Sequence, residues 1–261
     1  MNRIEEKFRQ LKAKNKKAFI AFITAGFPDL STTAKLVLAL EKNGVDIIEL
    51  GVPFSDPLAD GPVIQDASAY SLKKGTNLPK ILNLVKNLRK KTNLPIALMT
   101  YYNPVFHFGD RHFISKAVLA GVDGVIIPDL PPEEAKDFIH YANKAGLANI
   151  CFVAPTSSTA RIKAISKKAK GFIYYVSLTG VTGRRKNLSA DLKTNLAKIK
   201  KLTSLPVCAG FGISNARQAR EVSKISDGVI IGSAIVSKIK NNIGCSSLVQ
   251  RVSSFAKSLN V

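Results

Sequence analysis

Eight short apolar runs recur along the 261-residue chain, and a segment of helical periodicity follows each of them. Continuous apolar runs of this length favour parallel strands that are buried on both faces. The runs cover residues 18–24, 47–50, 96–101, 124–127, 149–154, 172–176, 206–209 and 227–231. Eight strand–helix units in a chain of this length are typical of parallel strands that close into a barrel surrounded by helices.

We therefore expect an α/β fold, a (β/α)8 TIM barrel in which residues 1–261 form a single domain. An extra helix is predicted before the first strand, because Ile4, Phe8 and Leu11 have helical spacing. An open doubly wound sheet is the alternative, but it would want a Gly-x-Gly-x-x-Gly turn that residues 24–28 do not supply. The later helices are expected over 65–74, 78–91, 110–120, 132–145, 159–169, 189–202 and 214–224, with a last helical region that ends at Leu259.

The composition narrows the class of protein further. Hydrophobic residues make up 46% of the chain, but no run of 18 apolar residues occurs, so we expect a globular protein without a membrane partner. The N-terminal segment lacks the apolar stretch of a secretory signal. Three widely spaced cysteines, Cys151, Cys208 and Cys245, form no disulfide or zinc pattern. These features predict a cytoplasmic protein.

The net charge of +21 raises the alternative of a nucleic-acid or anionic-membrane surface. The segment from Thr156 to Leu205 is strongly basic and contains a single acidic residue, Asp191. However, aromatic residues are not interleaved with the basic ones, and no nucleic-acid-binding motif occurs. We interpret the charge as lysines on solvated helix faces and expect no nucleic-acid partner.

Two acidic residues stand out in the segment from Asp46 to Pro62. Glu49 lies inside an apolar run, and burying a carboxylate is costly unless it serves a purpose. Asp60 follows in a proline-rich loop that is stiff enough to fold back over the strand end. One interpretation places both carboxylates in one pocket; the other pairs Glu49 with a Lys or Arg and uses Asp60 as a helix cap.

Glycines mark the loops after the last three strands. They occur in the segments 180–183, 210–212 and 232–234, and Ser214 and Ser233 are expected to begin helices. Glycine lets backbone N–H groups approach an anion, and helix N-termini offer unpaired donors. Barrels commonly bind phosphate at the loops after strands seven and eight, so we predict a phosphate site here.

The remaining strand ends are apolar or aromatic, which suits a flat aromatic substrate. The candidate wall residues are Phe22, Met99, Tyr101, Ile127, Tyr174 and Phe211, and Thr24 also lies at a strand end. No lysine stands at a strand end, and the three histidines lie in a loop and on helices. A Schiff-base lysine and a metal site are therefore not expected. What remains is acid–base chemistry by two carboxylates on a phosphorylated substrate.

Five segments resemble one known family, the tryptophan synthase alpha subunit. The most specific is Glu-Leu-Gly-Val-Pro-Phe-Ser-Asp-Pro-Leu-Ala-Asp-Gly-Pro at residues 49–62. The others lie at residues 98–104, 128–132, 177–183 and 209–214, and the likeness covers essentially the whole chain. The resemblance implies a lyase of tryptophan biosynthesis that cleaves indole-3-glycerol phosphate by retro-aldol to indole and glyceraldehyde 3-phosphate.

The resemblance also implies roles for individual residues. Glu49 would protonate indole C3 and help to deprotonate the glycerol hydroxyl, and Asp60 would accept a hydrogen bond from the indole N–H. Tyr174 matches the family's active-site tyrosine. The residues that match its phosphate and substrate contacts are Thr182, Gly183, Gly212, Gly232 and Ser233. Glu49 needs a raised pKa for this role, which apolar neighbours would supply.

The family works with a beta subunit in an α2β2 heterotetramer, and that partner receives the indole and holds PLP, so no cofactor is expected in this chain. Segments 53–60, 101–110 and 129–132 resemble the partner surface. One departure is the basic run Arg184-Arg-Lys186 directly after Gly183. Two alternatives remain. One is another phosphate-binding barrel enzyme, such as an indole-3-glycerol phosphate synthase, which would need catalytic lysines at strand ends. The other is a basic binding protein.

Overall fold

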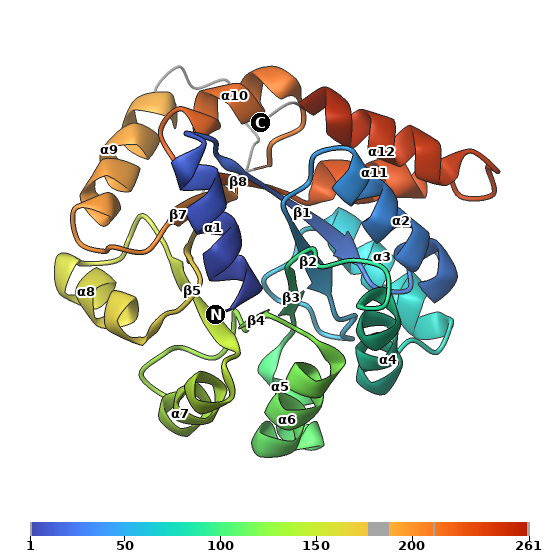
Figure 1. The fold of residues 1–261 in the computed structure, drawn as a ribbon, viewed down its shortest axis with the longest axis horizontal. Helices are drawn as coiled ribbons and strands as arrows, with labels where there is room; N and C mark the ends of the chain where they lie inside the picture. The colour runs from blue at the N-terminus through green and yellow to red at the C-terminus, as the bar shows by residue number, and fades with distance from the viewer. Residues whose placement is uncertain (1, 177–187, 211, 260–261) are drawn as a thin grey trace.

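Eight parallel strands form a closed barrel in the computed structural model, which describes residues 2–176, 188–210 and 212–259 (Figure 1). Each strand pairs with the next one along the chain, and β8 pairs with β1 to close the ring. The strands are β1 Ala18–Thr24, β2 Ile47–Gly51, β3 Ile96–Met99, β4 Gly124–Ile126, β5 Ala148–Val153, β6 Ile173–Val176, β7 Val207–Gly210 and β8 Gly228–Ile231. This confirms the expected (β/α)8 barrel.

Helices surround the barrel, as Figure 1 shows, and connect each strand to the next. They are α1 Arg3–Ala13, α2 Leu30–Lys42, α3 Pro62–Lys73, α4 Leu78–Leu88, α5 Tyr102–Phe108, α6 Asp110–Ala120, α7 Lys136–Ala145, α8 Thr159–Lys168, α9 Leu188–Lys200, α10 Ala216–Ser223, α11 Ser233–Lys240 and α12 Leu248–Leu259. None of the helices in the described part of the chain is both long and apolar enough to cross a bilayer.

Two buried clusters fill the molecule, one on each face of the sheet. Successive side chains of a strand point to opposite faces. In β1, Ala18 and Ile20 belong to the inner cluster, which fills the barrel, whereas Phe19 and Ile23 belong to the outer cluster between strands and helices. Both faces are therefore buried, which explains why the strand sequences are continuous apolar runs.

The predicted N-terminal helix is α1, and it lies across the ring of strands (Figure 1). Its apolar residues Ile4, Phe8 and Leu11 join the inner cluster, and the Phe8 ring lies 5.7 Å from that of Phe172. Each fully buried side chain of this size contributes about 2 kcal/mol to the free energy of folding. α1 therefore closes the N-terminal end of the barrel and leaves the C-terminal ends of the strands for chemistry.

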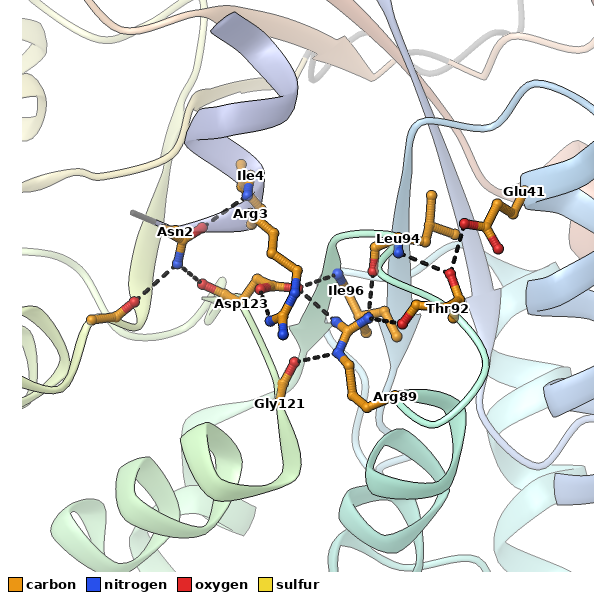
Figure 2. A network of polar contacts seen from close by, with 11 residues as sticks. Asn2, Arg3, Ile4, Glu41, Arg89, Thr92, Leu94, Ile96, Gly121 and Asp123 are labelled. Carbon is orange, nitrogen blue, oxygen red and sulfur yellow. Dashed lines mark hydrogen bonds and ion pairs between the residues drawn. The ribbon is translucent and has the colours of Figure 1, made fainter. Parts of the chain in front are cut away.

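Asp123 organises the polar contacts at this closed end (Figure 2). Its carboxylate, which is 3% exposed, pairs with Arg3 at 2.8 Å and with Arg89 at 2.7 Å. It also accepts a hydrogen bond from the Ile96 N–H at 2.8 Å. The Asn2 side chain donates to the Asp123 carbonyl oxygen at 2.6 Å, which anchors the start of α1 to β4.

Several helix boundaries differ from the sequence expectation. α3 begins at Pro62 instead of at residue 65, and α7 begins at Lys136 instead of at residue 132. α10 begins at Ala216 and is capped by the Asn215 side chain, so the expectation that Ser214 begins this helix was wrong. The last helical region is two helices, and α5 was not expected at all.

Candidate active site

Glu49 lies on the inner face of β2, at the level of Phe22 on the neighbouring strand. Its side chain is fully buried, and neither carboxylate oxygen has a hydrogen-bond partner among the described residues. Burial, and to a lesser degree the charge of Asp60, raises the pKa of Glu49 to about 8. No lysine or arginine of the described chain forms an ion pair with it. The alternative of a structural ion pair at Glu49 is therefore not supported.

Asp60 lies in the loop between β2 and α3 and is half-buried. Burial raises its pKa to about 6, although a hydrogen bond from Tyr101 opposes the rise. Asp60 does not cap α3, because the residue at the cap position is Gly61 and no side chain bonds there. Both carboxylates thus lie near the C-terminal end of β2, close enough for the charge of Asp60 to act on Glu49.

The charge of Asp60 raises the pKa of Glu49, whereas Glu49 has no such effect on the pKa of Asp60. As the pH rises, Asp60 ionises first, while Glu49 is still neutral. Glu49 then loses its proton in the presence of a negative neighbour, so the repulsion falls on its pKa. At neutral pH the pair therefore holds one proton donor, Glu49, and one anion, Asp60.

Tyr101 holds Asp60 in place from the end of β3. Its hydroxyl donates a hydrogen bond to Asp60 Oδ2 at 3.1 Å and accepts one from the Ala59 N–H at 2.9 Å. Its ring stacks on Phe54 with the ring centroids 5.3 Å apart. Tyr101, expected as a substrate contact, is thus seen to fix the loop that carries Asp60.

Phe22 packs between Gly51, the last residue of β2, and Gly232, which follows β8. A Cβ atom added to Gly51 would lie 2.5 Å from Cζ of Phe22, and one added to Gly232 would lie 3.3 Å from its Cβ. A side chain at Gly51 would overlap the ring, and one at Gly232 would crowd it. Phe22 therefore links the region of Glu49 with the start of α11.

Tyr174 lies on the inner face of β6, and burial followed by the charge of Glu49 raises its pKa well above the usual value. Its ring lies 4.7 Å from that of Phe152 and directly against Gly210. Met99 also packs against the inner cluster. The aromatic wall predicted around Glu49 is therefore built from β1, β3, β5 and β6.

Ile127, an expected wall residue, belongs to the outer cluster instead of the inner one. Ile126 belongs to the inner cluster and pairs in register with Met99, whereas Ile127 belongs to the outer cluster. Ile126 and Phe152, which were not expected as wall residues, belong to or pack against the inner cluster. The period of two along each strand identifies both once the structure shows that Gly124 and Ala148 face inward.

Gly232 and Ser233 lie where β8 ends and α11 begins, as expected. The first-turn N–H groups of this helix face the C-terminal end of the barrel, where an anion is stabilised by unpaired donors and by the helix dipole. Gly212 lies in the loop before α10. Thr182, Gly183 and Phe211 lie outside the described residues. Of the described residues of the predicted phosphate site, Gly232 adjoins Phe22.

The chain is similar to one family along nearly its whole length. A family model described as "Tryptophan synthase alpha chain" matches residues 8–260. The tryptophan synthase alpha chain of Geotalea daltonii is 52% identical over 94% of this chain and 92% of its own length. That of Thermoanaerobacter sp. is 47% identical over 99% and 98%.

Solved structures show the same likeness. The crystal structure of tryptophan synthase subunit alpha from Legionella pneumophila matches with a TM-score of 0.93 and 38% identity, and the match covers 99% of this chain and 97% of that one. A chain of the ligand-free tryptophan synthase from M. tuberculosis matches with a TM-score of 0.89 and 30% identity over 99% and 98%.

Proposed function

The chain belongs to the tryptophan synthase alpha chain family, and from this premise we propose that Glu49 and Asp60 carry out the family's reaction in the mouth of this barrel. The chain is a lyase of tryptophan biosynthesis that cleaves indole-3-glycerol phosphate to indole and glyceraldehyde 3-phosphate. The observation that supports these residue roles is the pair of carboxylates whose pKa values are about 8 and about 6.

Glu49 is the general acid and base. With a pKa of about 8 it is protonated at neutral pH and can donate its proton to indole C3. That step makes the ring an electron sink. The bond between C3 and the glycerol chain then breaks, its electrons return to the ring, and the adjacent hydroxyl loses its proton to Glu49 as it becomes the aldehyde. The atoms balance without an added reactant.

Asp60 stabilises the positive charge of the intermediate that forms between protonation of C3 and cleavage of the C–C bond. Protonation at C3 leaves a positive charge that is shared with the indole nitrogen. With a pKa of about 6, Asp60 is ionised at neutral pH and can accept the indole N–H hydrogen bond. Tyr101 already holds the second oxygen of this carboxylate. Tyr174 and Phe152, which lie side by side, supply an apolar surface for the indole ring.

The phosphate of the substrate would bind at the start of α11. Gly232 and Ser233 present backbone donors there, and we assign Gly212, in the loop before α10, to the same phosphate by the family's pattern. By the family's pattern, we also expect Thr182 and Gly183 to bind this part of the substrate. Phe22, between Gly51 and Gly232, separates the reacting carbon from this anchor.

The variant Glu49→Gln tests the assignment. It keeps the shape of the side chain but removes the proton that C3 receives, so kcat for indole release should fall about 10²- to 10⁴-fold. Glu5→Gln, on an exposed position of α1 at the closed end, is the matched control and should keep its activity. A Glu49→Gln protein that is folded by circular dichroism and retains activity would contradict the role.

The chain works in a complex with the beta subunit, to which indole is passed. We place the contact surface on segments 53–60, 101–110 and 129–132, and expect an α2β2 heterotetramer. Two apolar side chains in these segments support the placement: Leu58 is 91% exposed and Phe106 is 69% exposed. A partner that covers these segments would bury both side chains, and buried apolar side chains are typical of the centre of a protein interface.

We propose that PLP belongs to the partner and that this chain uses no cofactor. At the strand ends that the structure describes, no lysine is placed to form a Schiff base. The absorbance spectrum of the purified chain tests this, since a bound PLP would absorb visible light. We also propose the cytoplasm as its compartment, because all three cysteines are free thiols. Fractionation of the source cells tests that assignment.

A further inference from the structure

Thr24 is the last residue of β1 and carries a buried hydroxyl that the proposed roles leave unused. The residues of β1 alternate between the two faces of the sheet, and Ala18 and Ile20 face the barrel interior. The same period directs Thr24 inward. Thr24 pairs in register with Gly51, two residues beyond Glu49 on the neighbouring strand. The Cα atoms of Thr24 and Glu49 are thus roughly 8 Å apart, from the standard strand spacing and rise.

The hydroxyl of Thr24 has no hydrogen-bond partner among the residues that the structure describes, although the side chain is 1% exposed. Two other buried threonines are satisfied. Thr33 Oγ1 donates to the Asp29 carbonyl at 2.8 Å, and Thr92 Oγ1 donates to Glu41 at 2.7 Å. An unpaired buried hydroxyl destabilises a protein, so its presence at the mouth of the barrel calls for a ligand.

Both carboxylate oxygens of Glu49 are unpaired in the same way. Three polar atoms on adjacent strands thus face one region of the mouth, and Thr24 and Glu49 do not bond to each other. Gly51, directly opposite Thr24, contributes no side chain, and the ring of Phe22 packs beside it, so no polar group of β2 lies there to bond the Thr24 hydroxyl. A hydroxyl group is the natural ligand to lie between them, because it can donate to a carboxylate and accept from a threonine at once.

We propose that Thr24 is a further catalytic residue, which donates a hydrogen bond to the glycerol hydroxyl oxygen that Glu49 deprotonates. The inference rests on the proposed roles of the site. As the C–C bond breaks, the proton of that hydroxyl moves to Glu49 and its oxygen becomes the aldehyde oxygen. Negative charge builds on this oxygen during the transfer, so the Thr24 hydrogen bond strengthens in the transition state. Thr24 keeps its own proton throughout.

The test compares Thr24→Val with Thr24→Ser. Valine keeps the shape but loses the donor, so kcat should fall about 100-fold while KM changes by less than about threefold. Serine keeps the donor and should restore most of kcat. The melting temperature of Thr24→Val without substrate should equal or exceed that of the unaltered chain, because valine removes an unpaired buried hydroxyl. Thr24→Ala removes the donor in a second way, should the valine variant not fold.

Thr92→Val is the matched control at the closed end of the barrel (Figure 2). The Leu94 N–H and the Glu41 carboxylate lose a partner there, so this variant should melt at a lower temperature and keep its kcat. The inference is overturned if Thr24→Val keeps kcat within threefold, if only KM changes, or if valine and serine lower kcat and melting temperature alike. Failure of the unaltered chain to release indole would instead refute the roles on which the inference rests, which separates the two failures.

Discussion

The chemistry of this barrel depends on how differently two carboxylates are treated by their surroundings. Glu49 is fully buried with an anion nearby, and it receives no hydrogen bond from the described residues. Asp60 is half-buried, and its carboxylate receives the hydroxyl of Tyr101. The pKa values of about 8 and about 6 therefore leave a window near neutral pH in which one group is an acid and the other an anion.

This window predicts the pH dependence of kcat/KM, which reports the free enzyme. Activity should rise as Asp60 ionises near pH 6 and fall as Glu49 loses its proton near pH 8. The fall near pH 8 is the diagnostic part of the profile. The rise near pH 6 is ambiguous, because the phosphate group of the substrate also ionises near pH 6. Steady-state rates between pH 5 and 10 would measure both limbs. A kcat/KM that stays flat through pH 9 would contradict the acid role of Glu49.

Tyr101→Phe should weaken the site without touching the reacting atoms. The variant keeps the ring that stacks on Phe54 but loses the hydrogen bond that lowers the pKa of Asp60. We expect the acidic limb to move to higher pH and kcat/KM to fall about tenfold, a loss of one charged hydrogen bond. Tyr141→Phe is the control, because it loses a hydroxyl contact with Arg111 outside the site. Equal profiles for Tyr101→Phe and the unaltered chain would exclude the positioning role.

Among the elements, the closed end of the barrel is stabilised by charge as well as by apolar packing. Asp123→Asn should lower the free energy of unfolding by about 3 kcal/mol, because it leaves the nearly buried Arg89 without its anion. Glu133→Gln is the control, since its ion pair with Arg161 is half-exposed and contributes less than about 1 kcal/mol. Urea titration measures both, and kcat should be unchanged in each. A similar small loss in the two variants would show that the Asp123 network is not stabilising.

The strands were predictable because each is a continuous apolar run, and the predicted and observed bounds agree within about two residues. Helix α5 was not, because a seven-residue segment with Pro104 shows no helical period. It forms because Val105 is buried in the outer cluster. This is a tertiary contact, which the local sequence does not predict. The N–H groups of Glu134 and Ala135 bond to the Pro131 carbonyl in a turn, so α7 begins at Lys136 and not at the predicted residue 132.

The candidate site was predictable to a similar extent. A carboxylate inside an apolar run drew attention to Glu49 without any structure. The sequence did not determine which of Ile126 and Ile127 faces inward, because a shift of one residue exchanges the faces of a strand. It also did not reveal that Tyr101 bonds Asp60, since 41 residues separate the two and only closure of the barrel brings them together.

At the scale of the whole molecule, we propose that residues 1–261 form one domain. Every strand is hydrogen-bonded to two neighbours, so no cut divides the chain without breaking a ladder. Hydrogen exchange tests this. Val229→Ala in β8 should lower the protection of β1 amides, and unchanged protection there would argue for separate units.

The partner surface gives a prediction for the assembled enzyme. Leu58→Asp and Phe106→Asp should each weaken binding of the beta subunit about tenfold or more, because a charge replaces an apolar side chain in the contact. Leu119→Asp is the matched control: Leu119 is 74% exposed on α6 but lies outside the proposed surface. Calorimetric titration with the beta subunit measures all three. A loss of affinity in Leu119→Asp alone would move the contact to another face.

The closure of one barrel end by α1 has a consequence for genetics. In a host that lacks its own alpha chain, random alleles could be scored for growth without added tryptophan at several temperatures. Alleles that alter Ile4, Phe8 or Asp123 should support growth in the cold and fail in the heat, since they affect folding alone. Alleles at Glu49 should fail at every temperature, so a simple plate assay would map the two ends of the fold.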